Sequence, residues 1–370
     1  MKIRFCGPTL DTSGYGEFSR YFVEALHNAG HEVCVEPILA DPKPNMDFGK
    51  KGSLCKQLQK ASRRPDINIV TMIPMFFKKY SLPNCKNVGF TMWETTRVPD
   101  DWVKQCNEMD AILVPCEWNK KTFVDSGVTV PIHIVYPGMS EDDFPEAVNL
   151  KDKKTDAFHF YSIFQWIERK NPIGLLRAYF AEFASNENVC LTLKTYRSTN
   201  IGNNQQLIMS QIDALKKDLK LKDYPEIRLL TNFLSHDELR ALHKENHCFV
   251  LPHRAEGFGL PHMKAMSYGN PTIATDFSGN VDFMLKDNSY PIPYHLTPAF
   301  GMSNFVPWYD GTMYWAEPDL YTLAKTMRDV YKNYEEALSK GLQGRLFIMR
   351  NFNEAASVEM MEDAIKNILK

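Results

Sequence analysis

Short apolar runs alternate with longer amphipathic stretches along almost the whole chain, and this alternation strongly constrains the fold. Runs typical of buried strands lie at 1–6, 31–37, 67–73, 87–93, 111–116 and 132–138, and again at 158–164, 189–195, 226–230 and 248–252. Helical stretches separate them. At 16–30, for example, Phe18, Phe22, Ala25 and Leu26 share one face. Strands separated by helices predict an α/β protein with parallel, doubly wound sheets covered on both faces.

The alternation breaks at 135–156, which is polar and rich in turn residues, and then restarts. We therefore expect two Rossmann-like domains, at 1–150 and 151–345, followed by an amphipathic helix at 346–370. Ligands of open α/β sheets bind beyond the carboxyl ends of the strands. Functional residues are expected in the loops there, facing a central cleft.

Composition narrows the class of protein. Hydrophobic residues make up 44% of the 370 residues and charged residues 24%, which is typical of a soluble globular protein, and the net charge of -2 gives no overall attraction to nucleic acid or membranes. The eight cysteines form no C-x-x-C pair, which argues against a zinc cage and fits reduced thiols. No apolar run approaches the roughly 20 residues of a transmembrane helix. A cytoplasmic protein is expected.

The stretch 253–279, "HRAEGFGLPHMKAMSYGNPTIATDFSG", has the pattern of a strand end, a glycine-rich turn and a helix opening at Pro261. Three backbone N–H groups would then point outward at the start of the helix and suit a diphosphate, namely those of Phe258, Gly259 and Leu260. A carboxylate at Glu256 suits sugar hydroxyls instead, because it only accepts hydrogen bonds. The alternative is a plain strand-turn-helix with a surface glutamate.

The longer string "PHRAEGFGLPHMKAMSYGNPTIAT" resembles the donor-site signature of the GT4 family of GT-B glycosyltransferases, "EGFGLPxxEAMxxGxPVIAS". The resemblance implies a GT-B fold and a Glu256 that contacts the donor sugar. It also implies that Phe258, Gly259 and Leu260 bind the diphosphate. In this family the domain at 1–150 would bind the acceptor, the domain at 151–345 would bind the nucleotide-sugar, and the helix at 346–370 would cross back to the first domain. Lys264 stands where the family has a second glutamate that holds the ribose, and an ammonium can only donate.

Two further segments resemble phosphate-binding regions of this family. "GPTLDTSGYGEFSRY" follows the first strand and places Gly14, Tyr15 and Gly16 before a helix, although a lone G-x-G is more often a simple turn. "FYSIFQWIERKNPIGLLRAY" contains Lys170 in the place of the family's lysine, with Gln165 where an arginine is usual. Arg169, directly before Lys170, is the candidate for that arginine's role of neutralising the leaving diphosphate.

The remaining parts of the predicted donor site have weaker sequence motifs. In "FTMWETTRVPDDW", Glu94 could orient hydroxyls or could simply lie at a capped strand end. In "TNFLSHDELRAL", the backbone near Thr231 and Asn232 is expected beside the nucleotide base. The sequence contains no D-x-D, so we predict neither a metal ion nor another cofactor.

A basic segment in the N-terminal half raises the question of the acceptor. Its cations are Lys50, Lys51, Lys56, Lys60, Arg63 and Arg64. They fit either a solvated helix surface or an anionic acceptor, nucleic acid or a lipid phosphate. An aromatic-rich insertion at 290–315 could shape an acceptor lip or pack over the second domain.

The function expected from the resemblance is transfer of a sugar, with retention, from a nucleoside diphosphate sugar, UDP-sugar favoured, to an acceptor hydroxyl. A glycan, a lipid-linked acceptor and a hydroxymethylated base of phage DNA are the acceptor candidates. Two alternatives stay open. Lys264 is compatible with an inactive nucleotide-sugar-binding protein. A sugar-nucleotide epimerase would share the fold but needs acid-base side chains.

Overall fold

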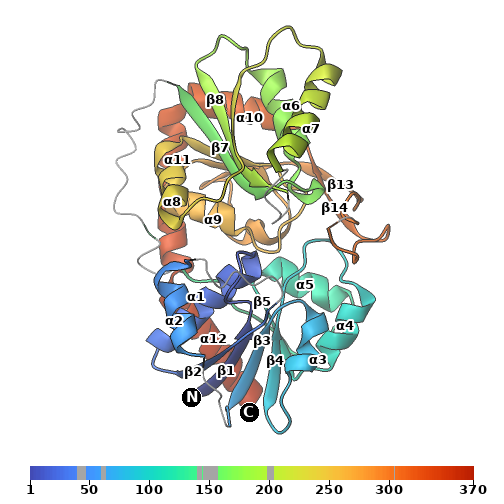
Figure 1. The fold of residues 1–370 in the computed structure, drawn as a ribbon, viewed down its shortest axis with the longest axis vertical. Coiled ribbons are helices and arrows are strands. Elements are labelled where there is room, and N and C mark those ends of the chain that lie inside the picture. The colour runs from blue at the N-terminus through green and yellow to red at the C-terminus, as the bar shows by residue number, and fades with distance from the viewer. Residues whose placement is uncertain (40–46, 60–63, 140–143, 145–156, 198–203, 304) are drawn as a thin grey trace. The chain divides into compact units, whose positions relative to one another are not determined.

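The computed structural model describes residues 1–39, 47–59, 64–139, 144, 157–197, 204–303 and 305–370. The chain divides into two compact units. The first unit comprises Met1–Phe144 and Met349–Lys370, and the second comprises Pro145–Ile348. Each unit contains a six-stranded parallel sheet with helices packed against it (Figure 1), so the α/β prediction with two doubly wound sheets is confirmed.

The sheet of the first unit has the strand order β2-β1-β3-β4-β5-β6. Its strands are β1 (Lys2–Gly7), β2 (Glu32–Pro37), β3 (Ile67–Thr71), β4 (Lys86–Phe90), β5 (Ala111–Val114) and β6 (Ile132–Ile134). Its helices are α1 (Gly14–Asn28), α2 (Gly49–Gln57), η1 (Pro74–Phe76), α3 (Phe77–Tyr80), α4 (Asp100–Asn107), α5 (Glu117–Asp125) and α12 (Glu354–Leu369).

The central strands of this sheet are buried on both faces. Every residue of β3 and β5 is buried, as near-continuous apolar runs predict for a parallel sheet. Helix α1 buries the predicted face, and its Phe18 and Phe22 rings pack on Phe90 of β4 at centroid distances of 6.1 and 4.8 Å.

Helix α12 belongs to the first unit although it is encoded last, and in Figure 1 it lies in red among the blue elements of that unit. A β-bridge joins Met139 to Asn353 just before it. The Ser357 hydroxyl donates to the Tyr136 carbonyl at 2.7 Å, and the ring of His31 meets Glu362 at 3.1 Å. Helix α12 is therefore anchored by polar contacts, and its Met361, Ala364 and Ile365 are buried.

The sheet of the second unit has the order β12-β11-β10-β7-β8-β9. Its strands are β7 (Phe158–Gln165), β8 (Val189–Tyr196), β9 (Glu226–Leu230), β10 (Cys248–Leu251), β11 (Thr272–Thr275) and β12 (Tyr290–Ile292). Its helices are η4 (Glu168–Lys170), α6 (Pro172–Glu182), α7 (Asn204–Leu219), α8 (His236–Glu245), α9 (Leu260–Ser267), η6 (Ser278–Asp282), α10 (Leu320–Lys332) and α11 (Tyr334–Asn351).

The aromatic-rich insertion forms an antiparallel hairpin of β13 (Tyr294–Pro298) and β14 (Tyr314–Pro318), separate from the six-stranded sheet. The expected start of a C-terminal helix at 346 falls inside α11, and the boundary between the units lies between Ile348 and Met349. Among the described residues, no helix combines the length and apolarity that a membrane span requires.

Candidate functional site

The strand order of the second unit brings two loops together. Strand β7 is the first of the unit in sequence, and β8 and β9 lie on one side of it while β10 to β12 lie on the other. Strands β7 and β10 are direct neighbours, with Tyr161 opposite Phe249. The chain therefore turns in opposite directions after β7 and after β10, and a crevice is expected where their carboxyl-end loops diverge.

A buried ionic cluster forms at this point. The Lys170 ammonium donates to Oε1 of Glu256, and Nη1 of Arg169 lies 3.5 Å from Oε2. The Glu256 side chain is only 6% exposed. Burial alone would raise the pKa of Glu256, but the two cations outweigh it and hold that pKa well below its usual range. The cluster carries one net positive charge.

The backbone around the cluster is fixed by side chains that sequence reasoning missed. Asn171 has a left-handed φ of 53° and caps α6, accepting from the Gly174 N–H at 3.1 Å. Its amide also donates to the Pro252 carbonyl at 3.0 Å, which joins the two loops. On the other side, the Glu256 N–H donates to the Ser278 hydroxyl at 2.7 Å. An asparagine directly before proline at a helix start is the one local signal of such a cap.

The turn after Glu256 begins α9. Gly259 has a φ of +102°, a conformation that favours glycine. The N–H groups of Gly259 and Leu260 donate no hydrogen bond within the described part of the chain. The Phe258 ring is buried on Phe283 at a centroid distance of 5.2 Å. The predicted role of these N–H groups in anion binding has the required helix start, and it stays a prediction.

Two buried histidines lie directly behind the cluster. The rings of His253 and His262 meet edge to face, with centroids 5.0 Å apart. No ring nitrogen of the pair makes a well-formed hydrogen bond within the described residues. Burial lowers the pKa of His262 to about 4, against an opposing effect of Glu256, and it lowers the pKa of His253 well below its usual value. Both rings are therefore neutral at neutral pH.

Lys264 lies on α9, beyond the turn, and its side chain is half-buried. Its carbonyl accepts from the Ser267 hydroxyl at 2.7 Å as part of the helix. The effect of this lysine on ribose binding stays a prediction.

In the first unit, side chains of the loop after β1 cap helix α1 and pack closely against its first turn. Ser13 caps α1 and accepts from the Gly16 N–H at 3.0 Å. A Cβ at Gly16 would lie 2.3 Å from Oδ1 of Asp11, whereas one at Gly14 would meet nothing within 4 Å. The N–H of Gly16 therefore donates to the helix cap, and Gly16 is required by packing, while its place in the predicted phosphate-binding region stays a prediction.

The Tyr15 side chain makes hydrogen bonds within the first unit. Its hydroxyl is bonded to Oγ1 of Thr91 at 2.9 Å and accepts from the Met92 N–H at 3.2 Å. Burial raises the pKa of Tyr15 above its usual value. These bonds join the start of α1 to the loop after β4, which carries Glu94. The Tyr15 hydroxyl thus links two segments of the first unit that are 76 residues apart, and the role of Tyr15 in donor binding stays a prediction.

Residues 201–290 match the family model described as "Glycosyl transferases group 1". Among solved structures, sucrose-phosphate synthase from Thermosynechococcus elongatus has a TM-score of 0.71 at 14% identity, over 99% of this chain and 98% of that chain. The Anabaena protein HepE, in complex with UDP-glucose, has a TM-score of 0.69 at 11% identity, over 99% of this chain and 100% of that chain. The fold is GT-B.

TarM from S. aureus is longer. It matches with a TM-score of 0.58 at 14% identity over 81% of this chain, which spans 55% of the TarM chain. None of the curated proteins matches this sequence significantly. These likenesses place the Glu256 cluster in the second sheet-containing unit of a GT-B fold.

The remaining predicted donor residues lie at other strand ends of this GT-B unit. Gln165 ends β7, and its amide donates to the Arg197 carbonyl at 3.2 Å. Thr231 and Asn232 follow β9, which is the edge strand two positions from β7. That separation is about 10 Å. Gln165 therefore lies on the strand that leads into η4, with its amide toward β8, and the other two belong to a more distant part of the strand-end surface.

Glu94 and the predicted acceptor cations lie in the first unit. Glu94 follows Trp93, whose N–H donates to Oδ1 of Asn119 at 2.6 Å. Its role stays a prediction. Lys51 is not an available cation, because it pairs with Glu24 at 2.8 Å in a mostly buried position.

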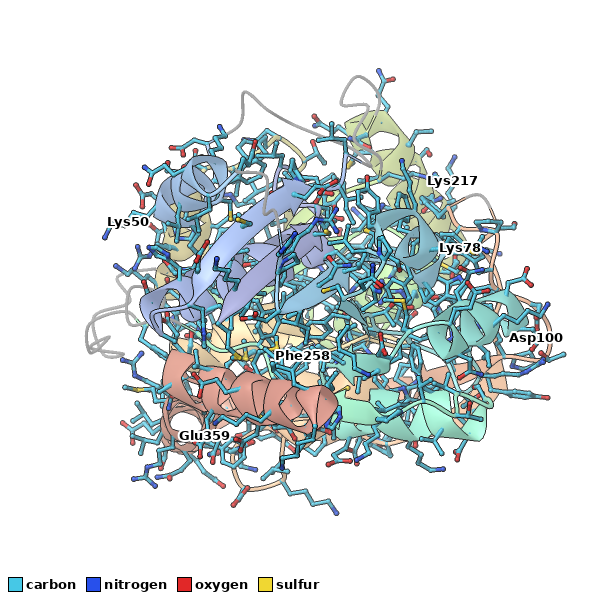
Figure 2. All side chains as sticks on the ribbon, turned by 90° about the horizontal axis from the view of Figure 1, so that it is seen from below. Lys50, Lys78, Asp100, Lys217, Phe258 and Glu359 are labelled. Atoms are coloured by element: carbon cyan, nitrogen blue, oxygen red, sulfur yellow. The ribbon has the colours of Figure 1, made fainter. Side chains whose placement is uncertain are left out.

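Of the other basic residues, Lys50, Lys56 and Arg64 are exposed, and Figure 2 shows Lys50 at the outer edge of its unit. Lys60 and Arg63 lie outside the described residues. Within the part of the chain that is described, no three His, Cys, Asp or Glu side chains are grouped so as to hold a metal ion.

Proposed function

We propose that this protein transfers a glycosyl group from a nucleoside diphosphate sugar, UDP-sugar favoured, to an acceptor hydroxyl with retention of configuration. The observation that carries the proposal is the buried cluster of Glu256, Lys170 and Arg169, which lies in the loops after the neighbouring strands β7 and β10 of a GT-B unit. The glycosyltransferase family match of 201–290 includes Glu256 and the turn after it. HepE, a structural neighbour, was solved with UDP-glucose.

The cluster can bind a nucleotide-sugar donor without breaking its ion pairs. An ammonium has three N–H donors and a guanidinium has five. Lys170 and Arg169 can therefore bind diphosphate oxygens while they remain bonded to Glu256. The carboxylate keeps lone pairs for sugar hydroxyls, and its low pKa keeps it ionised as an acceptor.

In the proposed reaction, the bond between the anomeric carbon and the diphosphate breaks while the acceptor oxygen attacks from the same face. The acceptor proton passes to the departing diphosphate oxygen, and no protein nucleophile is needed. Lys170 and Arg169, together with the N–H groups of Gly259 and Leu260, stabilise the growing negative charge in a buried setting, where such interactions are strong.

The experiment that tests the proposal is a thermal-shift screen with UDP, GDP, ADP and CMP, followed by donor hydrolysis assays. A nucleotide present at about 100 times its Kd adds about 2.7 kcal/mol of stability. We expect UDP to stabilise the protein and UDP-sugar to be hydrolysed slowly, with EDTA having no effect. The anomeric configuration of a transfer product, read by NMR, tests retention.

The second candidate is a nucleotide-sugar-binding protein without catalysis, and Lys264 is the observation that favours it. The Lys264→Glu variant restores a carboxylate in place of a donor-only ammonium. A wild-type protein that binds UDP but shows no turnover, with turnover gained in Lys264→Glu, would establish the binding protein. The absence of any nucleotide response in both forms would refute the donor site altogether.

A further inference from the structure

Arg254 connects three segments of the second unit that are far apart in sequence. It lies in the loop after β10, two residues before Glu256, and its side chain is 10% exposed. It contacts the 3₁₀ turn η4 on one side and the hairpin β13–β14 on the other. Neither the predicted donor chemistry nor the caps described above account for these contacts.

On the η4 side, Arg254 holds the backbone that carries the two cations. Its Nη1 donates to the Glu168 carbonyl at 2.6 Å and lies 3.2 Å from that residue's carboxylate. Its own N–H donates to the Arg169 carbonyl at 2.8 Å. Two successive peptide groups of η4 are thus held by one residue, directly before Lys170.

On the hairpin side, the same guanidinium forms a two-point ion pair. Its Nε lies 2.7 Å from Oε2 of Glu317, and its Nη2 lies 3.2 Å from Oε1. The guanidinium lies over the rings of Phe300 and Trp315, at 5.1 and 5.8 Å from their centroids. The Ala316 N–H donates to the Arg254 carbonyl at 3.0 Å, which fixes the hairpin to the loop.

A glycine shows how closely the hairpin loop approaches η4. Gly301 has a φ of +72°, and a Cβ there would lie 2.4 Å from Cγ of Glu168. The insertion therefore packs against the same residue that Arg254 binds. The insertion therefore contacts η4 in two ways. One is polar, through Glu317 and Arg254, and the other is the close packing of Gly301 on Glu168.

We propose that Arg254 is a positioning residue, which uses the hairpin β13–β14 as a brace to hold η4 so that Arg169 and Lys170 meet Glu256. Its effect on donor binding rests on the proposed function, but its effect on η4 does not. Only an arginine presents the planar fork that binds Glu317 at two points and still reaches a carbonyl.

The test compares Arg254→Lys with Arg328→Lys. Arg328 is a matched control, because it also joins two carboxylates and lies over aromatic rings, but it connects α10 to the end of α6. We expect amide hydrogen exchange in peptides covering 165–171 to be at least about tenfold faster in Arg254→Lys and unchanged in Arg328→Lys. Equal exchange in wild type and Arg254→Lys would overturn the proposal.

The functional arm uses UDP binding and UDP-glucose hydrolysis. We expect kcat/KM to fall about 10- to 100-fold in Arg254→Lys, because displaced cations stabilise the transition state poorly. Arg328→Lys should keep wild-type values even where its stability falls. A wild type with no binding or turnover would refute the proposed function, while the exchange data would still decide the role of Arg254.

A milder variant protects the test against misfolding. Glu317→Gln keeps the arginine and the shape of its partner but removes the charge. We expect Glu317→Gln to show smaller effects than Arg254→Lys in the same direction, namely faster amide exchange at 165–171 and a lower kcat/KM. Loss of activity with wild-type exchange at 165–171 would contradict positioning through η4.

Discussion

The buried histidine pair predicts that the second unit loses stability in mild acid. His262 has an ordinary pKa of 6.5 when unfolded and a pKa of about 4 in the fold, since burial disfavours its charged form. Between these values the unfolded chain binds a proton that the native state does not, so unfolding becomes easier as the pH falls. Above the unfolded pKa both states are neutral, and this contribution vanishes.

The magnitude follows from the two pKa values. Each unit between them is worth about 1.4 kcal/mol, so the interval from 6.5 to about 4 corresponds to about 3 kcal/mol of unfolding free energy. Glu256, Lys170 and Arg169 face the pair, with Glu256 favouring protonation and the two cations opposing it. His253 acts in the same direction as His262.

The assay is urea unfolding followed by tryptophan fluorescence at about pH 7 and about pH 4. His262→Met removes the titrating ring at similar volume, and we expect it to reduce the loss of stability between the two pH values by about 3 kcal/mol. His295→Met, at an exposed position on β13, serves as the control and should leave the loss unchanged. An identical loss in wild type and His262→Met would refute the reasoning.

Three further predictions concern the two units. Glu256→Gln removes the carboxylate charge that balances Lys170 and Arg169 in a buried setting, which should cost about 3 to 5 kcal/mol of unfolding free energy. Added phosphate should restore more stability to this variant than to wild type in thermal scans, and equal gains would contradict the cluster. Tyr15→Phe should cost about 1 to 3 kcal/mol by leaving the Met92 N–H buried without its acceptor, and unchanged urea midpoints would show that the link is dispensable. Gly16→Ala should destabilise the first unit by about 1 to 3 kcal/mol because its Cβ would meet the preceding loop, while Gly14→Ala should be tolerated; similar midpoints for the two would disprove the packing argument.

Local sequence patterns were sufficient to predict the helices, the strands and the α/β architecture. Pro261 near the start of α9 and Gly269 after its end mark that helix in the sequence, and the fully buried β10 and β11 are continuous apolar or β-branched runs. Strand order then places Lys170 and Glu256 on neighbouring loops. Sequence reasoning selected these two residues because their type and spacing matched a known signature.

Long-range partners could not be read from local patterns. The glycines beside Tyr15 place it in the predicted donor site, but they give no sign that its hydroxyl is bonded to Thr91. Arg254 gave no signal at all, because its partners Glu168 and Glu317 lie 86 and 63 residues away. Lys51 was counted as an available cation, although Glu24 on α1 neutralises it. Each of these contacts is a pair that only the tertiary fold creates.

The discontinuous first unit has a consequence for synthesis on the ribosome. Residues up to Phe144 emerge early, but α12 is made only after the whole second unit. At roughly 5 to 20 residues per second, the interval lasts about 10 to 45 s. The position that α12 fills beside His31 and Tyr136 is empty during that time. The first half of the nascent chain is thus a partly built domain, dependent on chaperones or on its own marginal stability, while the second half has time to fold first.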